Sequence, residues 1–336
     1  MSDILNLKLL RPLKPFLYIV SILTLAFLFT YYTSFLVKDT NIYIKVLLYI
    51  ILFSFGMEVS SKLIDYLLRK IVKPKTLPRF NFAKTIDKKY KTYVVMPTII
   101  SSIEKLDNMI NKMEITYLAN RTDNMYYMLL GDCMQSDKAK IDIDDKIVAY
   151  AKEKLDKLNE KYKSDHKIFN FIYRKRVYSK GEKSYMGWER KRGGLLQFNR
   201  LILGKMSKEE MDKAFYITYY DFVKAKYAIT VDEDTEVSLN TAKDLVGIIS
   251  HPLNRPVLSK NGKIVKSGYG LIQPSVGLDI EAANKTIFSK IFGGFGGLDI
   301  YTNAISNVYQ DVFGEAIFCG KGIYDIELFE KLVAPE

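Results

Sequence analysis

The stretch "KYAITVDED", residues 226–234, predicts a short buried strand that ends in a cluster of acids. Its aromatic and β-branched residues favour an extended backbone, and the acids mark the carboxyl end of the strand. A helical pattern, "NTAKDLVGIIS" at 240–250, follows after a short polar segment. Because a strand that leads into a helix is the repeating unit of parallel sheets, this stretch indicates an α/β fold.

The same alternation of strand and helix recurs upstream. Predicted strands are "TYVVMPT" (92–98), "MYYMLLGD" (125–132) and "IFNFIYRK" (168–175), and helical patterns follow at 101–120, 141–162 and 193–205. This order predicts a doubly wound, mainly parallel sheet. Ligands bind such sheets beyond the carboxyl ends of the strands, so we expect Pro97, Asp132 and the acids at 232–234 to gather there.

Residues 1–70 predict a two-helix transmembrane hairpin. The stretch 16–37 carries no charge, and at about 1.5 Å per residue it can cross a hydrocarbon core of roughly 30 Å. A second apolar stretch, 41–58, follows after a short link. The alternative is a helical hairpin buried in a soluble core. The uninterrupted length of the first stretch favours the membrane.

Basic residues predict how these helices are oriented. The link between them holds only Lys38, which Asp39 balances. The flanking cations are Lys8, Arg11 and Lys14 before the first span, and Arg69, Lys70, Lys73, Lys75 and Arg79 after the second. The positive-inside rule therefore predicts a multi-pass protein of the inner or plasma membrane with both ends in the cytoplasm. Residues 71–92 would form a basic linker against anionic headgroups, and 93–336 a cytoplasmic domain.

Composition narrows the classes of partner. The 336 residues carry a formal net charge of +12, which suits an anionic ligand. Nucleic acid is not expected as a partner, because no zinc-finger or RNP-type motif occurs. Cys133 and Cys319 are far apart and indicate no disulfide framework, so a reducing compartment is expected. The sequence also has no Walker A loop, GxGxxG or GxSxG motif.

The acidic cluster "TVDEDTEV", residues 230–237, puts four carboxylates into five positions. On an extended backbone alternate side chains point the same way, so Asp232 and Asp234 can share one ion while Glu233 faces elsewhere. Mg²⁺ or Mn²⁺ accepts one or two carboxylates together with substrate phosphates. The alternative is a loop of solvated acids.

A basic stretch, "GWERKRGG" at 187–194, precedes the helical pattern at 193–205. Arg190, Lys191 and Arg192 can neutralise phosphates beside the free N–H groups of a helix start. The alternative is a basic surface turn. Trp188, the one tryptophan of the chain, either stacks on a sugar or base or belongs to the core.

Several motifs occur in the order found in one enzyme family. They are "VVMPT", "YLAN", "MGWERKRG", "TVDEDT", "HPLNRP", "GYGLIQP" and "NVYQDVFGEAIFCGKGIYD". From about Tyr93 onward the chain resembles the glycosyltransferase domain of the cyclic β-1,2-glucan synthases, which is glycosyltransferase family 84-like. That resemblance implies a Rossmann-like fold of the GT-A type. It also implies inverting transfer of glucose from UDP-glucose to a growing β-glucan, with Mg²⁺ or Mn²⁺ as cofactor.

The resemblance also implies residue roles. Asp232 and Asp234 would bind the metal and UDP, Asp132 the uridine, and Lys191 and Arg192 the phosphates. The acceptor region would contain Trp188, Gln310, Asp311, Lys321 and Tyr324. Tyr178 is a candidate glucan attachment point, with an ordinary packed tyrosine as the alternative.

An inverting transferase needs a general base to deprotonate the acceptor hydroxyl. The resemblance places this base shortly after "GKGIYDIELFEKL", hence beyond Glu336. We therefore expect an N-terminal part of a longer enzyme, or a chain that a second chain completes. The remaining acids Asp299, Asp311, Glu315 and Asp325 are the alternative candidates for the base, although the motifs "VYQD" and "GKGIYD" are expected rather to line the acceptor channel or to hold its loops. The alternatives are a non-catalytic sugar-nucleotide-binding subunit or pseudoenzyme, and a basic membrane-surface adaptor without metal dependence.

Overall fold

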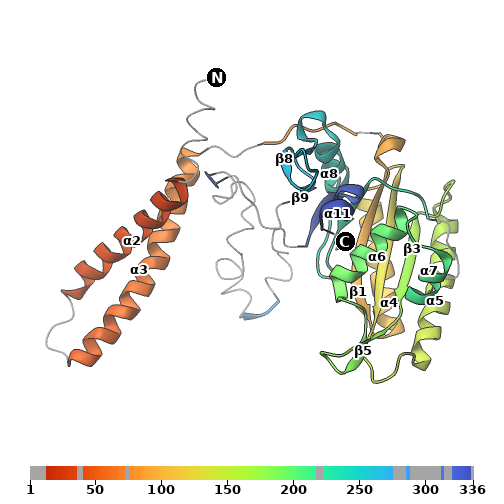
Figure 1. Ribbon diagram of the computed structural model, residues 1–336, viewed down its shortest axis with the longest axis horizontal. Helices are drawn as coiled ribbons and strands as arrows, with labels where there is room; N and C mark the ends of the chain where they lie inside the picture. Colours follow the sequence, from red (N-terminus) through yellow and green to blue (C-terminus); the bar gives the residue numbers. More distant parts are fainter. Residues whose placement is uncertain are drawn as a thin grey trace. The chain divides into compact units, whose positions relative to one another are not determined.

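The structure is a computed structural model that describes residues 13–35, 41–72, 76–82, 84–216, 222–274, 285–287, 312–313 and 320–333. The chain divides into two compact units (Figure 1). One comprises Met1–Thr76 and Ser275–Ile317, and the other Leu77–Pro274 and Phe318–Glu336. The predicted domain limits at 70 and 92 stay predictions.

The first unit contains helices α2 (Leu13–Ser34) and α3 (Ile42–Ile71), both long and apolar enough to cross a membrane. Only 11% and 6% of their most apolar windows are buried, which does not fit the core helices of a soluble domain. A Cβ added to Gly56 would lie 3.2 Å from the carbonyl oxygen of Ala26, so the two backbones approach closely through small residues. The helix α3 continues well past the predicted span, to Ile71.

The second unit is built on a six-stranded sheet in the order β3-β2-β1-β6-β10-β9. The strands β1, β2, β3 and β6 are parallel, whereas β10 runs antiparallel to both of its neighbours. The predicted mainly parallel sheet is therefore confirmed. The bounds are β1 (Thr92–Ile100), β2 (Met125–Cys133), β3 (Phe169–Arg174), β6 (Tyr227–Thr230), β9 (Leu271–Ile272) and β10 (Gly322–Asp325).

Helices cover both faces of this sheet, as a doubly wound fold requires (Figure 1). Buried side chains of α4 (Ile103–Ala119), α5 (Asp142–Lys161) and α8 (Thr241–Ser250) form one core with the strands. Those of α6 (Arg190–Ile202) form the core on the other face, to which α11 (Ile326–Val333) also contributes. The helix α4 begins two residues after the start of the predicted pattern at 101, where the Ser102 hydroxyl accepts a hydrogen bond from the Lys105 N–H at 3.1 Å and caps it.

The smaller elements were not predicted, because they are too short to show a hydrophobic period. They are the hairpins β4 (Val177–Ser179) with β5 (Ser184–Met186) and β7 (Val257–Leu258) with β8 (Val265–Ser267), the helix α7 (Lys208–Ala214), and the 3₁₀ turns η1 (Lys88–Tyr90) and η2 (Pro252–Asn254).

A fully buried ion pair connects α5 to the segment after β3. Arg176 donates to the Asp144 carboxylate at 2.6 Å, and neither side chain is exposed to solvent. Arg176 also donates to the carbonyl of Met134 at 2.5 Å, next to the end of β2. The pair thus fixes α5 against the carboxyl ends of two strands.

We expect Asp144→Asn to lower the free energy of unfolding by about 3–5 kcal/mol, because it leaves the buried Arg176 charge without its counter-charge. Asp145→Asn is the matched control on the same helix. Its carboxylate is 65% exposed and pairs with Lys140 at the surface, so the loss should stay below about 1 kcal/mol. Urea unfolding of the detergent-solubilised chain measures both, and equal losses would contradict the assigned role of the buried pair.

Candidate functional site

The carboxyl ends of β1, β2 and β6 meet at one edge of the sheet, as predicted. The last pairing hydrogen bond beyond β6 runs from the Val231 N–H to the Val95 carbonyl at 3.0 Å. The Thr235 N–H then donates to the Asp232 carbonyl at 3.1 Å and closes a turn. The acids at 232–234 therefore lie in a turn rather than on the extended backbone that the sequence suggested. We call residues 232–235 the acidic turn.

Two lysines face Asp232. Lys191 of α6 donates to one carboxylate oxygen of Asp232, and the Lys321 Nζ lies 3.5 Å from the other. The same Lys321 nitrogen is 3.7 Å from a carboxylate oxygen of Asp234. Both aspartates of the turn therefore lie near one cation, the Lys321 ammonium group.

This arrangement fits a divalent metal that also takes substrate oxygens. Mg²⁺ uses one or two carboxylates and completes its shell with water or phosphate. Within the described ranges, no group of three or more His, Cys, Asp or Glu side chains gathers to form a self-sufficient metal site. Asp232 and Asp234 are thus suited to hold a metal only together with a ligand.

The start of α6 brings Lys191 to this edge. The helix begins at Arg190, earlier than the predicted start at Gly193, because the Gly193 N–H already donates to the Glu189 carbonyl at 3.2 Å. Glu189 and Arg190 both have φ of 48°, in the left-handed region. A Cβ on Gly193 would lie 2.0 Å from the Trp188 carbonyl oxygen, so this turn requires glycine there.

The buried guanidinium of Arg174 holds that turn in place. It donates to the Asp132 carboxylate at 2.6 Å, to the Trp188 carbonyl at 2.6 Å and to the Arg190 carbonyl at 2.9 Å. A fourth hydrogen bond, to the Gln197 side chain, measures 2.7 Å. Burial raises the pKa of the Asp132 carboxyl above its ordinary value, although the charge of Arg174 opposes this. Asp132 therefore lies behind the start of α6, paired within the protein.

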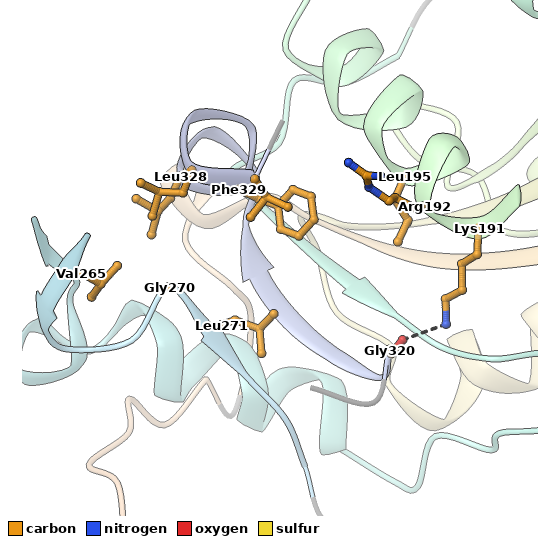
Figure 2. Close-up of a pocket in the computed structure, with 11 residues that line it drawn as sticks. Lys191, Arg192, Leu195, Val265, Gly270, Leu271, Gly320, Leu328 and Phe329 are labelled. Atoms are coloured by element: carbon orange, nitrogen blue, oxygen red, sulfur yellow. Dashed lines mark hydrogen bonds between the residues drawn. The ribbon is translucent and has the colours of Figure 1, made fainter. Parts of the chain in front are cut away.

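A cleft of about 810 Å³ opens beside Lys191 (Figure 2). Lys191 and Arg192 lie at its edge, and Lys191 donates to the Gly320 carbonyl at 3.0 Å. The Arg192 side chain is 60% exposed and contacts Glu189 at 3.2 Å. The apolar walls come from Leu195, Val265, Leu271, Leu328, Phe329, Leu332 and Val333.

The described residues of the predicted acceptor region do not lie in one common site. Lys321 lies at the acidic turn, and Trp188 lines a separate cleft of about 460 Å³. Tyr324 is buried and donates to the Asn199 side chain at 2.8 Å. Gln310 and Asp311 lie outside the described residues, so these acceptor roles stay predictions.

Two further predictions concern attachment and the base. Tyr178 is half-exposed on the β4–β5 hairpin, where its ring packs against Tyr185 at 5.2 Å between centroids. An attachment role for Tyr178 stays a prediction. The Asp325 carboxylate accepts from the Leu328 N–H at 3.0 Å and thus caps α11. The other acids considered, Asp299, Asp311 and Glu315, lie outside the described residues.

Sequence reasoning missed Arg174 and the surroundings of Glu233. The Glu233 carboxylate contacts Thr98 of β1 and Lys105 of α4. A signal for Arg174 existed, since an arginine at the carboxyl end of a buried strand needs an acidic partner and Asp132 ends a neighbouring strand. No comparable pattern in the sequence identifies Thr98 or Lys105.

Comparison with known proteins gives one informative match. The chain is 33% identical over 275 residues to the cyclic beta-(1,2)-glucan synthase NdvB of Rhizobium meliloti (strain 1021). The match covers 81% of this chain and 10% of that protein, so the chain spans about a tenth of the length of this curated relative. No family model matches the chain.

The Arg174 network can be tested through Trp188, the one tryptophan in the sequence. Arg174→Lys keeps the positive charge, but an ammonium group cannot donate simultaneously to Asp132 and to two backbone carbonyls as the planar guanidinium does. We expect stronger acrylamide quenching of Trp188 emission and faster proteolysis between 187 and 192. Arg79→Lys, at an exposed position that pairs with Asp244, is the control and should change neither. Unaltered quenching in Arg174→Lys would show that the turn does not depend on this guanidinium.

Proposed function

The chain is homologous to a segment of a cyclic β-1,2-glucan synthase, as its motifs predicted, and we propose that it acts as a membrane-bound glucosyltransferase. The donor would be UDP-glucose, the reaction would invert the anomeric configuration, and the product would be a β-glucan. The homology suggests a β-1,2 linkage. One observation in the sheet unit supports this proposal most. Asp232 and Asp234 at the carboxyl edge face Lys191 and Lys321, a charge arrangement suited to a metal-bound diphosphate.

Each of these residues has a proposed role. Asp232 and Asp234 would hold Mg²⁺ or Mn²⁺, which when bound offsets charge on the diphosphate leaving group. The ammonium groups of Lys191 and Lys321 now pair with Asp232, and both can turn to diphosphate oxygens once a divalent cation occupies the carboxylates. Arg192, exposed beside them, would add a further cation.

Asp132 is proposed to support the uridine subsite. Its carboxylate faces Gly187, since a Cβ on that glycine would lie 2.8 Å from the carboxylate oxygens. The segment that begins at Gly187 therefore covers Asp132, and a bound nucleoside would meet this segment. Because Arg174 already occupies this carboxylate, Asp132 would act on the uridine chiefly through the position of that segment.

The base that deprotonates the acceptor hydroxyl is left unassigned, since Asp325 is engaged as a helix cap. Binding of the sugar nucleotide and transfer of glucose to an acceptor must therefore be measured separately for this chain. A non-catalytic sugar-nucleotide-binding subunit would share the donor site and differ only in the absence of transfer.

The apolar helices α2 and α3 support membrane attachment. The basic residues on both sides of the helical hairpin support an orientation in which the sheet unit lies in the cytoplasm. Anionic lipid and the growing β-glucan would then be its further partners.

Asp232→Asn should weaken Mn²⁺-dependent binding of UDP by more than tenfold, since even changes around a metal ligand commonly cost about 10–100-fold in affinity. Calorimetry of the full chain in detergent, with and without Mn²⁺, measures this. Glu236→Gln is the matched control, because it removes one carboxylate from the same exposed cluster.

Two results would contradict the proposal: UDP binding that does not depend on Mn²⁺, or equal affinity in Asp232→Asn and the unchanged chain. Incubation of the same preparation with labelled UDP-glucose then separates the two candidate functions. Labelled polymer indicates the transferase, and binding without transfer indicates the sugar-nucleotide binder.

A further inference from the structure

The middle acid of the acidic turn, Glu233, does not face solvent freely. One carboxylate oxygen accepts a hydrogen bond from the Thr98 hydroxyl at 2.5 Å, and the other lies 3.0 Å from the Lys105 Nζ. Thr98 belongs to β1, and Lys105 to the first turn of α4. A single side chain thus connects the acidic turn to the central sheet and to a helix.

The backbone of Glu233 is held as well. The Lys112 ammonium group donates to its carbonyl oxygen at 2.5 Å. Lys105 and Lys112 are seven residues apart on α4, so they project from the same face of that helix. The side chain and the main chain of Glu233 therefore both contact one helical face.

These contacts offset the repulsion between neighbouring acids. Three adjacent carboxylates repel one another, and without cations or hydrogen-bond donors this repulsion would favour a backbone that holds them further apart. The Glu233 carboxylate is instead paired, with the Thr98 hydroxyl on one oxygen and the Lys105 ammonium group beside the other. Glu233 is thus bound on the side of α4.

The contacts of Glu233 also separate it from its neighbours. Lys321, which approaches both Asp232 and Asp234, directly precedes β10, the neighbour of β6, whereas Thr98 and Lys105 come from β1 and α4. Consecutive side chains of the turn consequently bind different elements. The turn can then neither rotate nor slide without breaking contacts on one side.

We infer that Glu233 is a positioning residue, which with Thr98, Lys105 and Lys112 fixes the acidic turn so that Asp232 and Asp234 are presented together to the metal and the donor diphosphate. This inference rests on the proposed donor site. It gives Glu233 a role through its neighbours and no contact with substrate.

Thr98 allows the sharpest test, because Thr98→Val removes the hydroxyl with almost no change in shape, whereas Thr98→Ser keeps it. In the full chain in detergent, we expect Thr98→Val and Glu233→Ala each to weaken Mn²⁺-dependent UDP binding by about tenfold or more. Thr98→Ser should bind as the unchanged chain does, and Glu236→Ala is the control within the cluster. Thermal melting should show that all four variants remain folded.

Hydrogen exchange gives a readout that does not depend on the ligand. The amide of Thr235, which closes the turn, should exchange faster in Thr98→Val than in Thr98→Ser. The inference is overturned if Thr98→Val and Glu233→Ala keep the affinity of the unchanged chain while Asp232→Asn loses it. If Asp232→Asn keeps its affinity too, the proposed donor site itself is wrong, and the positioning role is excluded with it.

Discussion

The buried guanidinium of Arg174 organises the edge of the sheet on which the candidate site depends. A charged group at this depth must have its hydrogen-bonding capacity filled, and its partners are Asp132 on β2 and the carbonyls of Trp188 and Arg190. Meeting this requirement fixes the left-handed turn at the start of α6. Lys191 is the next residue along, so its contact with Asp232 follows from the same constraint. The buried pair joins the neighbouring strands β3 and β2, and through Lys191 and Asp232 the network also reaches the end of β6, which β1 separates from β2.

The acidic turn shows how a crowded set of like charges can be stabilised. Each of the three acids lies near at least one lysine: Lys191 and Lys321 for Asp232, the shared Lys321 for Asp234, and Lys105 for Glu233. Contacts from different elements keep the charges apart and leave Asp234 mostly exposed. A site of this kind can exchange ammonium groups for a metal ion without refolding, since the carboxylates are already gathered.

The sequence predicted the sheet and its main helices because their apolar patterns are long, a continuous apolar run in β2 and a regular helical period in α5. It did not predict β9 and β10, since two to four residues carry no period and pairing with β6 depends on distant parts of the chain. The acidic pair at 232 and 234 could be identified as a candidate site from composition alone. Its partners Lys321, Thr98 and Lys105 could not, because only the fold brings them to the turn. The prediction of an extended backbone at 232–234 was wrong, because a local hydrogen bond from the Thr235 N–H to the Asp232 carbonyl closes a turn there.

The central claim is that the acidic turn binds a metal together with a nucleoside diphosphate. Anomalous diffraction from crystals of the chain grown with Mn²⁺ and UDP tests it most directly. The account predicts a single strong manganese peak between Asp232 and Asp234, with the Lys191 ammonium group moved from Asp232 to a diphosphate oxygen. Bound UDP with no manganese at these carboxylates, or manganese at another part of the sheet unit, would contradict it.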